Sequence, residues 1–187
     1  MSCLVLSSVF LVLGLGDMMM KNIAIVGFMG TGKSAVAIAL AERLGMSYVS
    51  TDDIVVLEEG GMSIHDIFKE KGEPTFREVE ARAVKKVSEM THVVIDCGGG
   101  VVLRDDNMKN LKRSGTVVCL IATPAVIYER VKGHRHRPLL NVADPQMAIK
   151  KVLTERAPFY ARADYTVDTS GLSIEEVVER ILKIFKK

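Results

Sequence analysis

The sequence of 187 residues contains no tryptophan, and aromatic residues make up only 5% of it. Base stacking depends on aromatic side chains, so this scarcity argues against a nucleic-acid stacking surface. Lysine and arginine together number 25 and aspartate and glutamate 23, which leaves a net charge of +2. That excess is too small to indicate nucleic acid or an anionic membrane as the main partner.

Cysteine is also scarce, because the sequence has only Cys3, Cys97 and Cys119, far apart from one another. This odd number and wide spacing match neither a disulfide framework nor a zinc-binding pattern. We therefore expect a reducing, cytoplasmic compartment. The composition of the whole sequence, 48% hydrophobic and 26% charged, is that of a globular protein and excludes a disordered chain.

The first twenty residues differ from the rest. Residues 3–16 are apolar apart from two serines. At about 14 residues this run is shorter than the roughly 17–25 residues of a spanning helix, and no positively charged segment precedes it as in a signal peptide. We expect residues 1–20 to be an extension from a start codon assigned too far upstream, with a signal or membrane anchor as the alternative. Residues 21–187 are expected to form one domain.

Short apolar segments alternate with helical patterns from residue 22 onward. This alternation predicts an α/β fold in which a parallel sheet has helices on both faces. Strands are expected at 22–27, 47–50, 92–96, 116–121 and 165–168. Helices are expected at 34–44, 52–59, from 63 onward, and at 74–90, 107–113, 124–132, 145–157 and 173–186.

The segment from Gly27 to Ser34, Gly-Phe-Met-Gly-Thr-Gly-Lys-Ser, fits the P-loop pattern and lies between an expected strand and an expected helix. Its glycines let backbone N–H groups converge on a phosphate, which also meets the N-terminus of the following helix. Lys33 adds a charge for the β- and γ-phosphates, and the Ser34 hydroxyl can bind Mg²⁺. We therefore predict a nucleotide site at Gly30, Thr31, Gly32, Lys33, Ser34 and Ala35.

A P-loop alone does not distinguish kinases from GTPases or motor ATPases. The chain lacks the Asn-Lys-x-Asp sequence with which a GTPase reads its base, and it is short for a large ATPase. A small-molecule kinase is therefore favoured.

Three charged residues are candidates for an acceptor site. Asp52 follows the second strand, so it should lie at the carboxyl edge of the sheet, where such sheets bind ligands; the alternative is a helix N-cap. Arg77 has Glu80 three residues later to brace it, unless the two form only a surface ion pair. Arg156 lies near a helix end, where it could instead complement the helix dipole.

Two loops add further candidates. Gly98, Gly99 and Gly100 directly follow the third strand, which is costly in conformational entropy unless a group approaches the backbone closely. The basic segment 134–137, which ends in Arg137, is suited to a mobile lid over ATP. The alternative for the three glycines is a flexible turn, and the alternative for segment 134–137 is a solvated loop.

In this order, the motifs resemble those of the shikimate kinase family over nearly all of residues 21–187. The resemblance rests on Gly27–Ser34, Asp52, 61–68, 72–77, Gly98–Gly100, 137–140 and 156–160. It implies a nucleoside-monophosphate-kinase-like P-loop fold, with a five-stranded parallel sheet of order 2-3-1-4-5 and a mobile lid. It also implies transfer of the γ-phosphoryl group of ATP to the 3-hydroxyl of shikimate in aromatic amino-acid synthesis. We expect a cytoplasmic monomer that uses ATP and Mg²⁺ and binds neither nucleic acid nor membrane.

The resemblance also assigns roles. Arg77 and Arg156 would grip the shikimate carboxylate, which suits the fork geometry of arginine. Asp52 would accept from the ring hydroxyls and act as the base, and Gly98, Gly99 and Gly100 would lie against the ring. Lys33 and Arg137 would neutralise the transferring phosphoryl group, while Arg130 and Arg137 would contact ATP.

The chain departs from the family pattern at two positions. The family has Asp-x-Asp after the second strand, where this chain has Ser50-Thr51-Asp52, and the first Asp helps to hold Mg²⁺ through water. Conversely, Asp96 stands where the family has a small hydroxyl residue two positions before the glycines. We expect Ser34 and, through water, Asp96 to hold the metal, unless Asp96 merely caps the glycine turn.

Other functions stay open at this point. A gluconate or nucleotide kinase would share the fold, although a nucleotide acceptor would need a base pocket. A nucleotide-binding regulator without catalytic activity would follow if the loss of the carboxylate at Ser50 abolished metal binding.

Overall fold

The computed structural model describes residues 21–133 and 142–186. Its centre is a five-stranded sheet of order β2-β3-β1-β4-β5, in which every neighbouring pair is parallel. This confirms the predicted order. The strands are β1 (Asn22–Gly27), β2 (Ser47–Ser50), β3 (Val93–Asp96), β4 (Gly115–Ile121) and β5 (Tyr165–Asp168).

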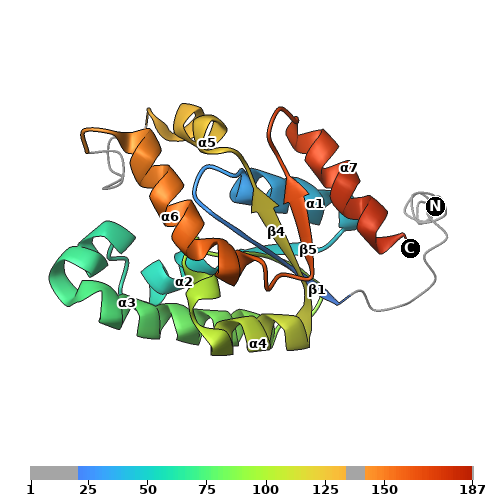
Figure 1. Cartoon of the computed structure of the whole chain (residues 1–187). Helices are drawn as coiled ribbons and strands as arrows, with labels where there is room; N and C mark the ends of the chain where they lie inside the picture. Colours follow the sequence, from blue (N-terminus) through green and yellow to red (C-terminus); the bar gives the residue numbers. More distant parts are fainter. Residues whose placement is uncertain (1–20, 134–141, 187) are drawn as a thin grey trace, which may run out of the picture.

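Helices cover both faces of the sheet (Figure 1). On one face, α1 (Lys33–Leu44) and α7 (Ile174–Phe185) pack against Ile23 and Ile25 of β1. On the other face, Ala24 and Val26 join a core with five helices. Both faces are buried, which explains why β1 reads as a continuous apolar run. The five helices are α2 (Thr51–Glu58), α3 (Ile64–Ser88), α4 (Asp105–Ser114), α5 (Pro124–Val131) and α6 (Pro145–Tyr160).

Helix α3 contains a break at Gly72, whose φ of 77° and ψ of 166° are not helical. Pro74 follows, so the chain forms a short helix and then a longer one, as the separate sequence signals at Ser63 and Pro74 predict. Ser63 caps the first helix by accepting a hydrogen bond from the N–H of Asp66 at 3.1 Å. Among the described residues, no helix is long and apolar enough to cross a membrane.

Two local elements differ from the sequence-based expectation. Helix α6 continues through Pro158 to Tyr160, whereas we expected an end at Ala157. Proline lacks the N–H and its ring crowds the carbonyl four residues earlier, which is why an end was expected there. The continuation of the helix brings Tyr160 to the functional site. A short 3₁₀ helix, η1 (Val101–Leu103), follows the three glycines and has no clear signal in the sequence.

Asn22 anchors the start of β1, the strand that carries the P-loop. It is 3% exposed, donates to the carbonyl of Met90 at 2.7 Å and accepts from the N–H of Val93 at 3.2 Å. The Asn22 side chain therefore fixes the N-terminal end of β1 against the turn that leads into β3.

Replacing Asn22 with alanine leaves the buried N–H of Val93 without its acceptor and removes the donor to the carbonyl of the exposed residue Met90. We expect Asn22→Ala to lower the free energy of unfolding by about 1–3 kcal/mol. Asn110→Ala, in the exposed pair with Arg113 on α4, is the matched control and should cost at most about 0.5 kcal/mol. Urea denaturation of both variants measures the difference, and equal values would contradict the anchoring role.

Candidate functional site

The P-loop joins β1 to α1 in the predicted strand–loop–helix arrangement. Gly30 and Gly32 have φ values of 74° and 92°, which favour glycine, and Gly32 occupies the N-cap of α1. Thr31 is buried and donates to the carbonyl of Phe28 at 2.8 Å, which holds the loop in shape. The N-terminal amides of α1 therefore face the region above the sheet edge, where an anion binds favourably.

A cavity of about 290 Å³ lies over this loop. Residues from β3 and from the first turn of α2 form its other side. The Lys33 ammonium donates to the carbonyl of Phe28 at 3.1 Å and lines the cavity. Of the predicted nucleotide and metal residues, those in the lining are Gly30, Gly32, Lys33, Ser34, Ala35 and Asp96.

Arg130, predicted to contact ATP, holds the P-loop against the loop after β5. Its guanidinium donates to the carbonyls of Gly30 at 3.3 Å and Thr169 at 2.8 Å. Thr169, which the sequence analysis missed, is 2% exposed and donates to the carbonyl of Thr31 at 3.1 Å. Its position directly after β5, at the carboxyl edge of the sheet, was the available signal.

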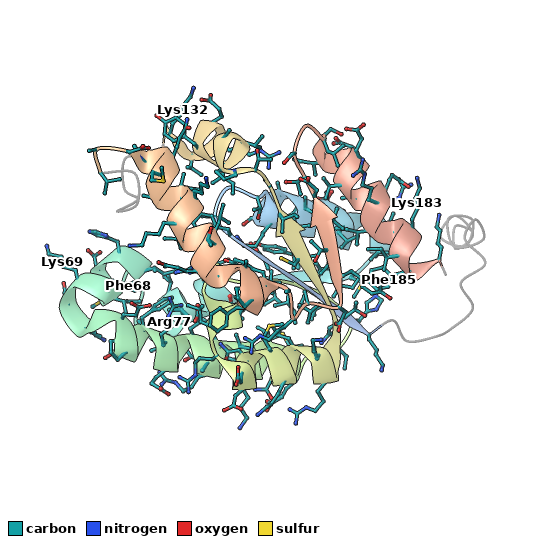
Figure 2. All side chains as sticks on the ribbon, viewed as in Figure 1. Phe68, Lys69, Arg77, Lys132, Lys183 and Phe185 are labelled. Carbon is teal, nitrogen blue, oxygen red and sulfur yellow. The ribbon has the colours of Figure 1, made fainter. Side chains whose placement is uncertain are left out.

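A second cavity of about 260 Å³ lies beside the first, between α3, α6 and the glycine turn. Phe68 and Arg77 project into it from α3, where Figure 2 labels both. Arg156 reaches it from α6, so the structure brings together the two arginines predicted from distant segments. The full lining is Phe28, Met29, Asp52, Ile64, Phe68, Phe76, Arg77, Glu80, Gly98, Gly99, Gly100 and Arg156.

Two carboxylates hold Arg77. Glu80 accepts from Nη1 at 2.9 and 3.1 Å, as predicted from its spacing, and Glu73 accepts from Nη2 at 2.8 Å. Glu73 was missed, although its spacing of four residues is the standard helical one. Burial lowers the pKa of Arg77, but Glu80 and Glu73 outweigh it and the pKa lies above its usual value. The guanidinium is therefore held in one position.

Two of the three glycines, Gly98 and Gly100, lie very close to charged side chains. A Cβ on Gly98 would lie 2.5 Å from Oδ1 of Asp52, and a Cβ on Gly100 would overlap Nη1 of Arg77. Side chains at these positions would displace the charged groups of the second cavity. A close approach is thus present at Gly98 and Gly100, whereas Gly99 has only ordinary contacts.

Gly99 is held by α6. Its carbonyl accepts from the hydroxyl of Tyr160 at 2.9 Å and from Nη1 of Arg156 at 3.5 Å. The Arg156 guanidinium also lies 6.0 Å from the ring centre of Phe28. Tyr160 is 6% exposed, and burial raises its pKa to about 12, so it stays a hydrogen-bond donor. Tyr160 belongs to the motif 156–160 that the resemblance uses, but no role was predicted for it.

Asp52 lies where the two cavities meet, and it lines both of them. It is not the N-cap of α2, because Ser50 takes that place and accepts from the N–H of Asp53 at 3.2 Å. Burial raises the pKa of Asp52, the charge of Lys33 partly opposes this, and Asp96 adds to it. A carboxylate with a raised pKa is a stronger base than an ordinary aspartate.

Ser34 and Asp96 both line the first cavity, as the predicted metal role requires. A hydroxyl and a carboxylate are oxygen donors of the kind that Mg²⁺ takes beside phosphates and water, so the donor set fits this ion. Residues 21–133 and 142–186 hold no group of three or more acidic, histidine or cysteine side chains that could bind a metal by themselves. Arg137 and the expected lid lie outside the described residues.

A P-loop beside a cavity lined by two arginines defines the class, a small-molecule kinase with a P-loop. Comparison with known proteins gives the family: the shikimate kinase family model matches residues 29–186. A shikimate kinase of Thermodesulfovibrio yellowstonii is 45% identical over 168 residues, 90% of this chain and 96% of that protein. One of Caldanaerobacter subterraneus is 44% identical over 168 residues, 90% and 98% of the two chains.

Solved structures agree. A shikimate kinase from Acinetobacter baumannii in complex with shikimate has a TM-score of 0.83 at 31% identity, covering 89% of this chain and 93% of that chain. The shikimate kinase from Aquifex aeolicus has a TM-score of 0.74 at 34% identity, covering 88% and 96%. The chain therefore belongs to the shikimate kinase family, whose members are small-molecule kinases that transfer a phosphoryl group from ATP to a hydroxyl of shikimate.

Gly100→Ala tests the second cavity directly. The new Cβ displaces the Arg77 guanidinium but meets only the end of a side chain, so the fold should tolerate it. We expect shikimate to bind about 10- to 150-fold more weakly, as for a lost charge-assisted contact, with ADP binding unchanged. Gly133→Ala, where a Cβ meets nothing within 4 Å, is the control. Calorimetric titration measures the affinity for both ligands. Unchanged shikimate affinity in Gly100→Ala would show that shikimate does not bind in the second cavity beside Arg77.

Proposed function

We propose that this protein phosphorylates the 3-hydroxyl of shikimate with ATP and Mg²⁺, with its nucleotide in the P-loop cavity and shikimate in the cavity beside it. The observation that carries this assignment of sites is the position of Asp52, which lines both cavities. A group at their junction can touch an acceptor hydroxyl while the phosphoryl donor lies on its other side.

The second cavity suits a small ring that carries a carboxylate and hydroxyls. Arg77 and Arg156 supply the cationic forks for the carboxylate, and Phe28, Phe68 and Phe76 supply apolar walls for the ring. Because Glu73 and Glu80 already hold Arg77, little side-chain entropy is lost when the acceptor binds. The acceptor hydroxyl is thereby oriented before the phosphoryl group is transferred.

Asp52 is proposed as the base. Its carboxylate would accept the proton of the attacking hydroxyl as the new O–P bond forms and the bond from the γ-phosphorus to the bridging oxygen breaks. Lys33 and the P-loop amides would stabilise the charge that develops on the phosphoryl oxygens. Bound Mg²⁺ would supply further charge neutralisation on the phosphates, with Ser34 among its ligands.

A coupled assay for ADP release with shikimate, ATP and Mg²⁺ tests the function itself. Gluconate and a nucleoside monophosphate serve as alternative acceptors in parallel reactions. ADP release with shikimate, but not with the other two acceptors, supports the proposal. ADP release with another acceptor and not with shikimate would overturn it.

Asp52→Asn should lower kcat by about 10²- to 10⁴-fold, because the amide cannot accept the proton. Burial raises the pKa of Asp52, so the folded protein binds this proton more tightly than the unfolded chain does. The ionised carboxylate therefore destabilises the fold at neutral pH, and Asp52→Asn should melt no lower than wild type at pH 7. This advantage should disappear below about pH 3.8, where the carboxyl is protonated in both states.

For the same reason, the acid limb of the wild-type kcat profile should lie above the pH range of an ordinary aspartate. Asp53→Asn, the adjacent carboxylate in the same helical turn, is the control and should retain kcat. A full loss of activity in both variants would argue against a specific base at Asp52.

The two arginines should differ in their effect on stability. Arg156→Ala and Arg77→Ala should each weaken shikimate binding by about 10- to 150-fold and leave ADP binding within about twofold. Arg77→Ala should also destabilise the fold by about 1–3 kcal/mol, because it leaves Glu80, only 1% exposed, without its partner.

Arg82→Ala, which removes an exposed α3 arginine paired with Glu58 at 3.5 Å, should change neither property. Calorimetry and thermal melts on the three variants measure both. Equal losses of shikimate and ADP affinity in Arg156→Ala would contradict its place in the acceptor cavity.

We also propose that the protein acts as a cytoplasmic monomer in which residues 21–187 form the kinase domain. Cys97 and Cys119 are both buried and unpaired, which is consistent with a reducing compartment. Analytical ultracentrifugation at assay concentrations tests the oligomeric state.

A further inference from the structure

Asp96 has no structural task that accounts for a buried carboxylate. It ends β3 and is 7% exposed, in a strand that is otherwise apolar. The turn that follows does not need it as a cap, because the N–H of Gly98 donates to the hydroxyl of Thr51 at 2.9 Å. The same hydroxyl donates to the backbone carbonyl of Asp96 at 3.4 Å. Buried carboxylates are paired or coordinate a metal, so a role other than capping is needed to account for Asp96.

The position of Asp96 is that of a metal carboxylate. It lies on β3, the neighbour of the P-loop strand, and Ile25 of β1 is its register partner. Its side chain is on the sheet face that α1 covers, since Val94, two residues earlier, belongs to the core with α1. Ser34 begins that helix, and both residues line the phosphate cavity. In P-loop proteins an acidic residue at a strand end assists the P-loop hydroxyl in holding Mg²⁺.

Ser50 is the register partner of Asp96 on the other side, in β2. Parallel partners lie about 4.8 Å apart and point to the same face of the sheet. A carboxylate at either position would therefore reach the same region through one water molecule. Ser50 provides no charge there, and its hydroxyl is occupied as the N-cap of α2.

Tyr48 positions the Asp96 carboxylate. Its hydroxyl donates to Oδ2 of Asp96 at 3.2 Å, from the same strand as Ser50 and two residues earlier. The charged and titratable groups around Asp96 include Lys33, Asp52 and Asp53, besides Tyr48. The negative charges exceed the positive ones here before any nucleotide is bound, and a divalent cation would offset them.

We propose that Asp96 holds the hydration shell of the divalent cation and replaces a carboxylate at the Ser50 position, with Tyr48 as its positioning residue. This inference rests on the proposed function for the presence of a nucleotide-bound Mg²⁺. It adds that, in this chain, the carboxylate that contributes to metal affinity lies at the end of β3 and not at the end of β2.

Metal binding to the ADP complex tests this without turnover. Mn²⁺ is titrated into the protein–ADP complex and followed by electron paramagnetic resonance, and ADP affinity is measured with and without Mg²⁺ by calorimetry. Asp96→Asn should weaken Mn²⁺ binding by about 10- to 100-fold, as for a lost outer-shell partner. Without metal, it should bind ADP equally or more tightly, because a negative charge near the phosphates is gone.

These opposite directions separate a metal role from damage to the fold, which would weaken ADP binding in both conditions. Tyr48→Phe should weaken Mn²⁺ binding by about 2- to 10-fold, and Asp53→Asn, the nearby control, should not change it. The exchange variant Ser50→Asp with Asp96→Ser should recover much of the affinity that Asp96→Ser alone loses.

Unchanged Mn²⁺ affinity in both Asp96→Asn and Asp96→Ser would overturn the proposal. Equal losses in Asp96→Asn and Asp53→Asn would also overturn it, since the effect would then be general electrostatics. Absence of shikimate phosphorylation in the wild type, with these metal results intact, would refute the proposed function and leave the metal assignment standing.

Discussion

The parallel pairing of β1 with β3 is the constraint on which the site depends. The pairing runs to the end of β3, where the N–H of Cys97 donates to the carbonyl of Ile25 at 3.0 Å. The P-loop and the glycine turn therefore leave the sheet side by side, and a Cβ on Gly99 would lie 3.5 Å from the carbonyl of Gly27. The two cavities are adjacent because two backbone segments leave adjacent strands at one edge of the sheet.

The strands, the P-loop and the Arg77–Glu80 pair have local signals in the sequence, whereas the strand order and the roles of Arg77 and Arg156 were implied by the family resemblance. The P-loop has its glycine spacing, and Arg77 has Glu80 within one helical turn. Contacts between distant segments could not be predicted from the sequence. Thr169 hydrogen-bonds to Thr31, and Tyr48 to Asp96, only because the fold brings them together. Tyr160 was part of the motif 156–160, but its hydrogen bond to Gly99 is likewise a contact between distant segments.

Burial makes the site reactive and also costs stability. Asp52 and Glu80 both have raised pKa values, chiefly because burial disfavours their charged forms. In Glu80 the nearby Arg77 offsets part of this cost, and in Asp52 Lys33 does so. The fold around them is an ordinary two-faced α/β core, which supplies the stability that these charges reduce.

The break at Gly72 divides the lining of the second cavity between two helical segments of α3. Ile64 and Phe68 precede the break, while Phe76, Arg77 and Glu80 follow it. The apolar lining is thus built partly on a separate short helix, and the Arg77 ion pairs lie wholly on the longer one. Substitutions in the short helix can therefore change the shape of this cavity without disturbing those ion pairs.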